Sequence, residues 1–231
     1  MINDLISIIL PTYNRSSFLS ERIKEFQNQT YQNWELIFIN DASTDNTIDI
    51  IKSYDDNRIK LITLDKNSNN GSIPRNIGIS NANGEYLCHC DDDNINMTNK
   101  LELLYNGLKD KNEFVLSYGD RITRWGKDEV SKVPDWNPKI SWGVDAGQFL
   151  YRTSVYDKIP LVFSRNACDW ELCKFIYDVG KFNYIPEIVE IMIFHGGNRS
   201  LDKVKCKRMD VYDYKELYNN KYKLHIVGEY E

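Results

Sequence analysis

The first 90 residues alternate between short apolar segments and amphipathic segments, and this alternation is the strongest constraint on the fold. Residues 5–10 and 34–40 are nearly continuous apolar runs, which are typical of buried parallel strands. Residues 18–28 and 47–54 follow these runs with apolar side chains at helical spacing. The pattern predicts an α/β fold, with a mostly parallel central sheet and helices on both of its faces.

Polar side chains follow the predicted strands at three places. The alternation continues with predicted strands at residues 58–64 and 86–90, so polar clusters at residues 11–15, 41–45 and 91–94 each lie at a strand end. Ligands of parallel sheets bind at the carboxyl ends of the strands. The convergence of three such clusters therefore predicts one ligand site at this edge of the sheet.

The last cluster contains three consecutive aspartates, Asp91, Asp92 and Asp93. Adjacent carboxylates repel one another, so a partner of positive charge is expected. A divalent cation and the phosphates that it carries would suit this requirement, because hard cations bind oxygen ligands. A solvated acidic turn is the alternative interpretation of the triplet considered alone.

The sequence lacks the signature motifs of two common nucleotide-binding folds. No G-x-G-x-x-G motif follows the first predicted strand, which disfavours a dinucleotide-dependent dehydrogenase. No G-x-x-x-x-G-K-[ST] motif occurs, which excludes a P-loop NTPase. A metal held by carboxylates is the remaining common device for binding phosphates.

Composition places the chain among globular proteins. The 231 residues are enough for one large domain, or for a core domain with a C-terminal extension, and the net charge of −5 argues against a nucleic-acid partner. Five cysteines, an odd number, favour a reducing compartment, and the pair Cys88 and Cys90 is better explained by buried thiols than by zinc. No apolar run is long enough to span a bilayer. We expect a cytoplasmic protein, with peripheral membrane contact and oligomeric state left open.

Seven segments in order resemble the family 2 glycosyltransferases, which have the GT-A fold. They are residues 7–15 (SIILPTYNR), 38–45 (FINDASTD), 75–78 (RNIG), 84–93 (GEYLCHCDDD), 147–152 (GQFLYR), 169–172 (DWEL) and 194–200 (FHGGNRS). The resemblance implies a domain over residues 1–200, with a nucleotide-binding part to about residue 120 and an acceptor part beyond it. Residues 201–231 would form a helical C-terminal extension.

The resemblance also implies a reaction. It predicts a metal-dependent inverting enzyme that moves a sugar from a nucleotide-diphosphate donor, by default a UDP-sugar, to a hydroxyl of a glycan or lipid-linked acceptor. Synthesis of a surface glycan or polysaccharide is the expected role. A non-catalytic protein that binds glycans or nucleotide sugars is the first alternative, and a sugar-nucleotide pyrophosphorylase is the second.

The donor would contact the first strand ends. The predicted donor-binding residues are Pro11, Thr12, Tyr13, Arg15, Asp41, Arg75, Asp91 and Asp92. By resemblance, Tyr13 would pack against the base, Asp41 would accept a hydrogen bond from it, and Arg75 would contact the diphosphate. The alternatives are a helix-packing tyrosine, a helix-capping aspartate and a surface arginine. Whether Asp91 or Asp92 reaches the ribose is left open.

The metal and the chemistry are assigned by the same resemblance. Asp93 is the predicted metal ligand for Mn²⁺ or Mg²⁺, with Asp91 and His195 as further candidates.

Asp169 is the predicted catalytic base, although Cys168 stands where the family has an acidic residue. An N-cap for the helix over residues 170–179 is a compatible alternative role for Asp169. Glu171, Trp142 and Arg199 are predicted acceptor-side or accessory residues. Residues 121–147 are expected to form a long loop.

Overall fold

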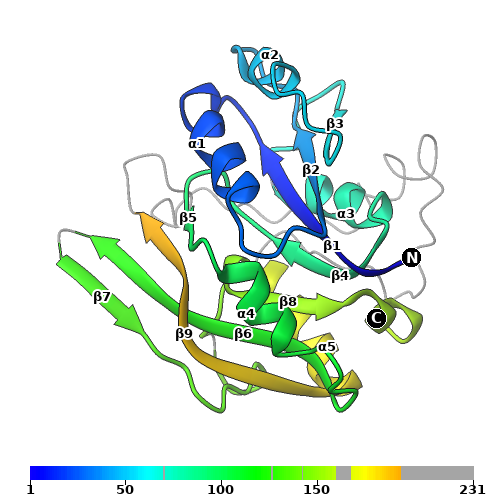
Figure 1. Ribbon diagram of the computed structural model, residues 1–231, viewed down its shortest axis with the longest axis vertical. Coiled ribbons are helices and arrows are strands. Elements are labelled where there is room, and N and C mark those ends of the chain that lie inside the picture. The colour runs from blue at the N-terminus through cyan, green and yellow to red at the C-terminus, as the bar shows by residue number, and fades with distance from the viewer. Residues whose placement is uncertain (70, 126, 142, 160–167, 194–231) are drawn as a thin grey trace.

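A single nine-stranded sheet forms the centre of the computed structural model (Figure 1), which describes residues 1–69, 71–125, 127–141, 143–159 and 168–193. The strands are β1 (Ile2–Thr12), β2 (Trp34–Asn40), β3 (Ile59–Thr63), β4 (Gly84–His89), β5 (Ile95–Asn96), β6 (Phe114–Trp125), β7 (Lys127–Ser131), β8 (Phe149–Arg152) and β9 (Lys181–Ile193). The helices are α1 (Ser16–Gln27), α2 (Thr47–Lys52), α3 (Ser72–Ser80), α4 (Lys100–Asn106) and α5 (Cys168–Val179), with 3₁₀ turns η1 (Ala146–Gln148) and η2 (Thr153–Asp157).

The strand order is β3-β2-β1-β4-β8-β6-β9-β5, and β7 pairs with β6 outside this path. The neighbours β3, β2, β1 and β4 are parallel, and β6 is parallel to β9. Strand β8 runs antiparallel between β4 and β6, and β5 and β7 are antiparallel to their partners. The predicted α/β class with a mostly parallel sheet is confirmed.

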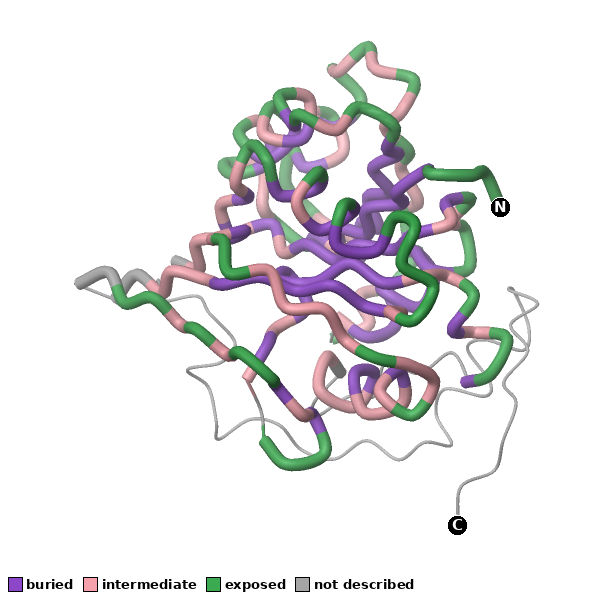
Figure 2. The backbone as a smooth tube through the Cα atoms, turned by 60° about the horizontal axis from the view of Figure 1, so that its bottom comes forward, coloured by how far each residue is buried: buried purple, intermediate pink, exposed green. Residues whose placement is uncertain are grey.

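Two hydrophobic clusters cover the two faces of the sheet. On β1, Ile6, Ile8 and Leu10 pack into the cluster that includes α1, α2 and α4, whereas Ile9 packs into the cluster that includes α3 and α5. Alternation along an otherwise apolar strand is expected for a strand buried on both sides. The central strands are accordingly the buried part of the chain in Figure 2.

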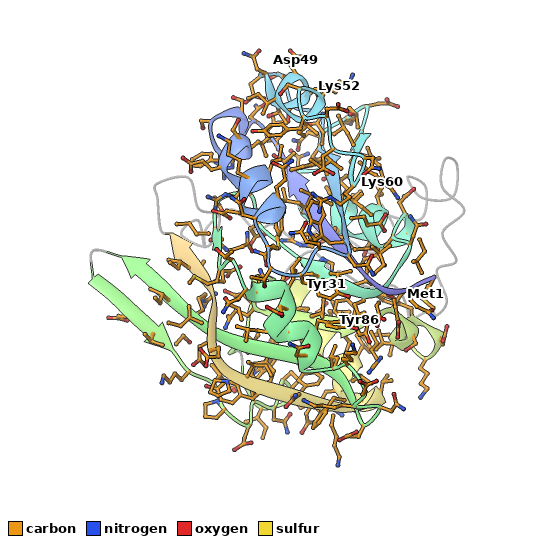
Figure 3. The ribbon with its side chains drawn as sticks, in the orientation of Figure 1. Met1, Tyr31, Asp49, Lys52, Lys60 and Tyr86 are labelled. Atoms are coloured by element: carbon orange, nitrogen blue, oxygen red, sulfur yellow. The ribbon has the colours of Figure 1, made fainter. Side chains whose placement is uncertain are left out.

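Buried polar groups stabilise the amino ends of the first strands. Glu35 of β2 accepts hydrogen bonds from Ser7 and from Asn83, and it pairs with Lys60 of β3, which Figure 3 labels. Burial raises the pKa of the Glu35 carboxyl, but the bonds from Lys60, Ser7 and Asn83 lower it by more, so the net pKa lies below its usual value. The first, second and third strands and the turn before the fourth are thus joined at the end of the sheet opposite the predicted site.

Residues 121–147 do not form the long loop that the sequence predicted. The end of β6, from Arg121 onward, and all of β7 fall in this segment and form an antiparallel hairpin, which extends away from the rest of the sheet beside β9 in Figure 1. β6 also pairs with β9, about 70 residues later in the chain. Such pairing depends on a distant partner, so local sequence pattern does not reveal it. Trp136 of the following loop is buried, and its indole N–H donates to the Ser141 carbonyl.

The described cysteines agree with the composition. Cys88, Cys90 and Cys173 are free and buried, as expected for structural thiols. Within the described ranges, no helix has both the length and the apolar composition that a membrane span requires.

Gly78 allows α3 to lie directly on the sheet. A Cβ at this position would lie 2.5 Å from Ile9 Cγ2 and 2.8 Å from Ile39 Cδ1. These are closer than van der Waals contact, so only glycine permits this approach without displacement of the helix. The helix carries Arg75 to the acidic strand end, so the contact at Gly78 also positions a predicted site residue.

Gly78→Ala should lower the free energy of unfolding by about 1–3 kcal/mol through overpacking. Alanine's higher helix propensity opposes this by about 1 kcal/mol, so the net loss lies at the lower end of the range. Urea denaturation followed by circular dichroism measures it. Ser80→Ala, at an exposed position of the same helix, is the control. Equal stability of the two variants would contradict the close approach.

Candidate active site

The candidate site lies where the carboxyl ends of β1, β2 and β4 meet. β2 and β4 lie on opposite sides of β1. The strand order therefore changes direction at β1, which makes this a topological switch point. Crevices for ligands form at such switch points. The three predicted polar clusters follow these three strands, and the structure brings them together.

The three aspartates after β4 pair with two arginines from different elements. Arg15, just before α1, places Nε 3.3 Å from Asp92 Oδ1 and Nη2 3.4 Å from Asp93 Oδ2. Arg75 of α3 places Nη2 2.5 Å from Asp91 Oδ1. The aspartates therefore do not form a solvated acidic turn. Two cations that the sequence places 16 and more residues away from them neutralise most of their mutual repulsion.

Asp92 is the most deeply buried of the three carboxyls. Its pKa is raised to about 7, chiefly by burial and also by repulsion from Asp93 and Asp91, while Thr12 and Arg15 act to lower it. Thr12, a predicted donor-binding residue, is itself buried at the end of β1. Pro11 and Thr12 belong to β1 rather than to the loop that the sequence predicted, because the β1–β2 ladder continues through both residues.

Hydrogen bonds connect the loop after β1 to the loop after β2. The Asn14 amide N–H donates to Ser43 Oγ at 2.9 Å, and the Thr44 amide N–H donates to Asn14 Oδ1 at 2.8 Å. Asn14 has a φ of 51°, a conformation that asparagine tolerates better than most residues. Tyr13, next to it, is 40% exposed, so it is not packed as a helix-covering aromatic. The loop thus leaves the Tyr13 side chain open to solvent.

The amino end of α2 is bound by the residue before its N-cap. The N-cap residue is Asn46, whose side chain makes no capping bond. The Asp45 carboxylate instead accepts hydrogen bonds from the backbone N–H groups of Ser16 and Thr47. Asp45 thus joins the amino ends of α1 and α2, because both helices begin beside the same pair of loops.

Asp41 is buried at the end of β2 and is held by the loop before α3. Its carboxylate oxygens accept hydrogen bonds from the Ser68 N–H and the Ser68 hydroxyl, both at 2.8 Å. The Asp41 carbonyl also accepts a bond from the Asn67 side chain. Ser68 and Asn67 are site residues that the sequence did not identify, and their position in a polar loop is the only signal for them.

Asp169 lies in the first turn of α5. The helix begins at Cys168, so Asp169 is inside it and not its N-cap, although a carboxylate in this turn is still favourable for the helix dipole. Asp169 Oδ2 accepts a hydrogen bond from the Ala146 N–H at 3.1 Å. Oδ1 is buried and accepts none from the part of the chain that the structure describes. Glu171, one residue beyond Trp170, is half-buried.

Arg121 is a cation that both the acidic cluster and Asp169 act upon, and sequence reasoning did not identify it. Its guanidinium pairs with Asp145. Burial lowers the pKa of Arg121, whereas the negative charges of Glu190, Asp91 and Asp169 raise it. Asp91 and Asp169 are therefore both within electrostatic reach of one cation, although they lie on β4's carboxyl end and on α5. His195, Arg199 and Trp142 lie outside the described residues.

The sequence model of glycosyl transferase family 2 matches residues 7–165, more than half of the chain. The chain belongs to glycosyltransferase family 2. This confirms the resemblance carried by the ordered motifs, and with it the membership of a family of transferases.

Relatives in this family come from several bacteria. Over 180 residues the chain is 39% identical to the poly(ribitol-phosphate) beta-N-acetylglucosaminyltransferase TarP of Staphylococcus aureus, covering 71% of this chain and 54% of TarP. It is 36% identical over 116 residues to the UDP-Glc:alpha-D-GlcNAc-diphosphoundecaprenol beta-1,3-glucosyltransferase WfgD of Escherichia coli, covering 50% and 45%. The chain thus spans about half the length of these relatives.

Solved glycosyltransferases share the fold of this family 2 chain. S. aureus TarS in complex with UDP-GlcNAc superposes with a TM-score of 0.71 at 20% identity, covering 92% of this chain and 64% of TarS. A mannosyltransferase of Pyrobaculum calidifontis in complex with GDP-Man and Mn²⁺ superposes with a TM-score of 0.63 at 14% identity, covering 84% and 58%. The predicted GT-A fold is confirmed.

The side-chain oxygens of this family 2 site are suitable ligands for a hard cation. Asp91, Asp92 and Asp93 offer only carboxylate oxygens, which Mg²⁺ and Mn²⁺ prefer. Among the described residues, no group of three or more His, Cys, Asp or Glu side chains is arranged as a ready metal centre. The oxygens of Asp91, Asp92 and Asp93 face arginines in the arrangement described above. The residue types fit a divalent ion, and the arginine pairs would have to open for direct ligation.

The raised pKa of Asp92 predicts a pH-dependent stability of the family 2 domain in the absence of metal. The Asp92 pKa is about 7 in the folded state and 3.8 as its ordinary value. This difference contributes to the free energy of unfolding in full below pH 4, and the contribution is lost as the pH rises through 7. Asp92→Asn keeps a neutral group and should be more stable than the parent at pH 8, by at most about 4 kcal/mol for a shift of about 3 units.

Thermal and urea denaturation in EDTA at pH 5 and pH 8 would measure this difference. The stability gap between Asp92→Asn and the parent should widen from pH 5 to pH 8. Asp55→Asn, an exposed carboxyl, is the control and should show no such trend. A gap that stays constant with pH would exclude Asp92 as the titrating group.

Proposed function

We propose that this chain transfers a sugar from a nucleotide-diphosphate donor to an acceptor hydroxyl, with inversion at the anomeric carbon and with a divalent metal ion. The observation that carries the proposal is that Asp91, at the donor side, and Asp169, the candidate base, both act electrostatically on the same cation, Arg121. Donor phosphates and an acceptor hydroxyl would have to meet in such a place.

The donor fits the strand ends of β1, β2 and β4. Tyr13 offers an exposed ring for stacking on a base, and Asp41, fixed by Ser68, offers carboxylate lone pairs beside it. Arg75 and Arg15 supply positive charge for a diphosphate. UDP-sugars are the first donors to test, since TarS is described with UDP-GlcNAc and WfgD as a UDP-Glc enzyme.

Asp93 is the proposed metal ligand, with Asp91 as a second. Mn²⁺ is named in the Pyrobaculum calidifontis structure, and it suits the oxygen donors of the cluster. A bound divalent ion supplies Lewis-acid neutralisation of the leaving diphosphate. Arg15, which pairs with Asp92 and Asp93, would be available to the donor phosphates if a divalent ion took its place at these carboxylates.

Asp169 is the proposed general base. Its Oδ2 is oriented by the Ala146 N–H, which leaves Oδ1 to accept the proton of the acceptor hydroxyl. As that proton leaves, the hydroxyl oxygen forms a bond to the anomeric carbon. The bond from this carbon to the diphosphate oxygen breaks, and its electron pair leaves with the nucleoside diphosphate. A single displacement of this kind inverts the configuration.

The acceptor would approach from the side of β6, β8 and α5. TarP is described as acting on poly(ribitol-phosphate), and WfgD on a diphosphoundecaprenol-linked sugar. A cell-surface polymer or its lipid-linked precursor is therefore the acceptor class that we propose. A cytoplasmic location with peripheral membrane contact would suit such an acceptor.

Donor binding should depend on the metal and on Asp93. Isothermal titration calorimetry with UDP-GlcNAc, UDP-Glc and GDP-Man, in Mn²⁺ and in EDTA, measures it. For the true donor we expect binding to weaken by at least about tenfold, or ~1.4 kcal/mol, in EDTA and in Asp93→Asn. Asp55→Asn is the control and should bind as the parent does. Equal affinity of Asp93→Asn and parent in Mn²⁺ would refute the assignment of the metal to Asp93.

Asp169→Asn should abolish most transfer while donor binding is kept. Loss of the base should lower the rate by about 10²–10⁴ in an assay of nucleoside diphosphate release with a poly(ribitol-phosphate) or lipid-linked acceptor. Asp178→Asn, at an exposed position of the same helix, is the control. If Asp169→Asn instead lowers the melting temperature and loses donor binding, its role is structural. Donor binding by the parent with no transfer to any acceptor would favour a non-catalytic binding protein.

A further inference from the structure

We infer that Glu190 is a positioning residue for the proposed transfer: its buried carboxylate holds Arg121 and the turn at residues 145–148, and through them Asp169. The inference rests on the proposed function for the role of Asp169. It concerns a residue on β9 that lies outside the motifs that carry the family resemblance.

Glu190 is a fully buried carboxylate with little local compensation. Its Oε2 lies 3.8 Å from Lys100 Nζ, and both side chains are 0% exposed. Lys100 Nζ donates instead to Asn96 Oδ1 at 2.6 Å. Within the described ranges, neither oxygen of Glu190 accepts a hydrogen bond. Burying a carboxylate costs several kcal/mol, and a buried ion pair is weak evidence for stability, so a purely stabilising role is a poor explanation.

The carboxylate lies directly against the backbone of the turn that orients the base. A Cβ built on Gly147 would lie 1.7 Å from Glu190 Oε2 and 2.5 Å from its Cδ. Any side chain at position 147 would therefore collide with the carboxylate. Glycine at this position and glutamate at 190 are matched in shape. The neighbouring residue, Ala146, provides the N–H that binds Asp169 Oδ2. The contact between Gly147 and Glu190 is therefore one residue away from the group that orients the base.

The same carboxylate lies on the strand next to that of Arg121. Arg121 of β6 and Glu190 of β9 are partners in register on parallel strands, so their side chains leave the same face. Arg121 also pairs with Asp145, the first residue of the turn. The turn is closed by Gln148, whose Oε1 accepts from the Asp145 N–H and whose Nε2 donates to the Gly119 carbonyl. Glu190 and Arg121 thus hold the turn from two sides.

The charges around Glu190 explain why a carboxylate, and not a neutral residue, would be required. Lys100 and Arg121 are the cations that act on it, and Asp91 and Asp169 are the anions. Without the Glu190 charge, the attraction of Arg121 for Asp91 and Asp169 is unopposed. Arg121 would then shift toward these carboxylates, and the turn that it anchors at Asp145 would move with it. Asp169 would lose its orientation toward the acceptor.

Glu190→Gln keeps the size of the side chain and removes its charge. We expect kcat to fall by up to about 10²-fold, the loss that a misplacement near 1 Å produces. The calorimetric Kd for the UDP-sugar in Mn²⁺ should stay at the parental value. Hydrogen exchange should be faster at the amides of residues 145–148. Glu187→Gln, an exposed glutamate of the same strand, is the matched control and should change none of the three.

Gly147→Ala tests the contact from the side of the turn and keeps the charge of Glu190. Its methyl group must displace the carboxylate or the turn, so the variant should reproduce the loss of kcat and the faster exchange. In a Glu190→Ala background the methyl group has room, so adding Gly147→Ala there should cost no further activity. This variant also keeps the test decisive if Glu190→Gln does not fold.

The outcomes separate the inference from the proposed function. Parental exchange of residues 145–148 in both Glu190→Gln and Gly147→Ala would overturn the inference whether or not transfer is observed. A joint loss of melting temperature, donor affinity and kcat would assign Glu190 a structural role and would also overturn it. Failure of the parent protein to bind or turn over any nucleotide sugar would instead refute the proposed function, while altered exchange would still support the contact.

Discussion

Repulsion among three adjacent carboxylates is the constraint on which the arrangement of this site depends. Asp91, Asp92 and Asp93 follow a buried strand, where the cost of unpaired charge is high. Arg15 and Arg75 provide the compensation, and they come from the loop after β1 and from α3. The charge balance of the cluster therefore requires that the first strand, the third helix and the fourth strand meet. The same arginines are the cations to which the phosphates of a donor would bind.

Close backbone approaches place these charges. Gly78 lets α3 lie on β1 and β2, and Gly147 lets the turn before β8 lie on the Glu190 carboxylate. In both places a Cβ would collide with a neighbour, so the spacing between layers is set by the missing side chain. Arg75 depends on the first contact and Asp169 on the second. The proposed donor half and the proposed acceptor half of the site would thus each be built on one such contact.

The sequence predicted the first half of the chain well. The apolar runs of β1 and β2 and the helical spacing of α1 identify buried parallel strands and their cover, because burial on both faces leaves a local signal. It was wrong about residues 121–147, where β6 and β7 form a hairpin. The side chains of β6 are mixed in polarity, and its partner β9 is distant in the chain, so no local pattern marks the strand. Asp45 joins the amino ends of two helices, a contact between distant segments that no local pattern marks.

The sequence alone determined the family, the fold class and the residue types of the site, because ordered motifs at strand ends are local features. The tertiary structure alone decided which charges meet. Arg15 with Asp92 and Asp93, Arg121 between Asp91 and Asp169, and Glu190 against Gly147 join residues that are distant in the chain. The register between β6 and β9 places Arg121 beside Glu190, since a shift by one residue would turn the two side chains to opposite faces.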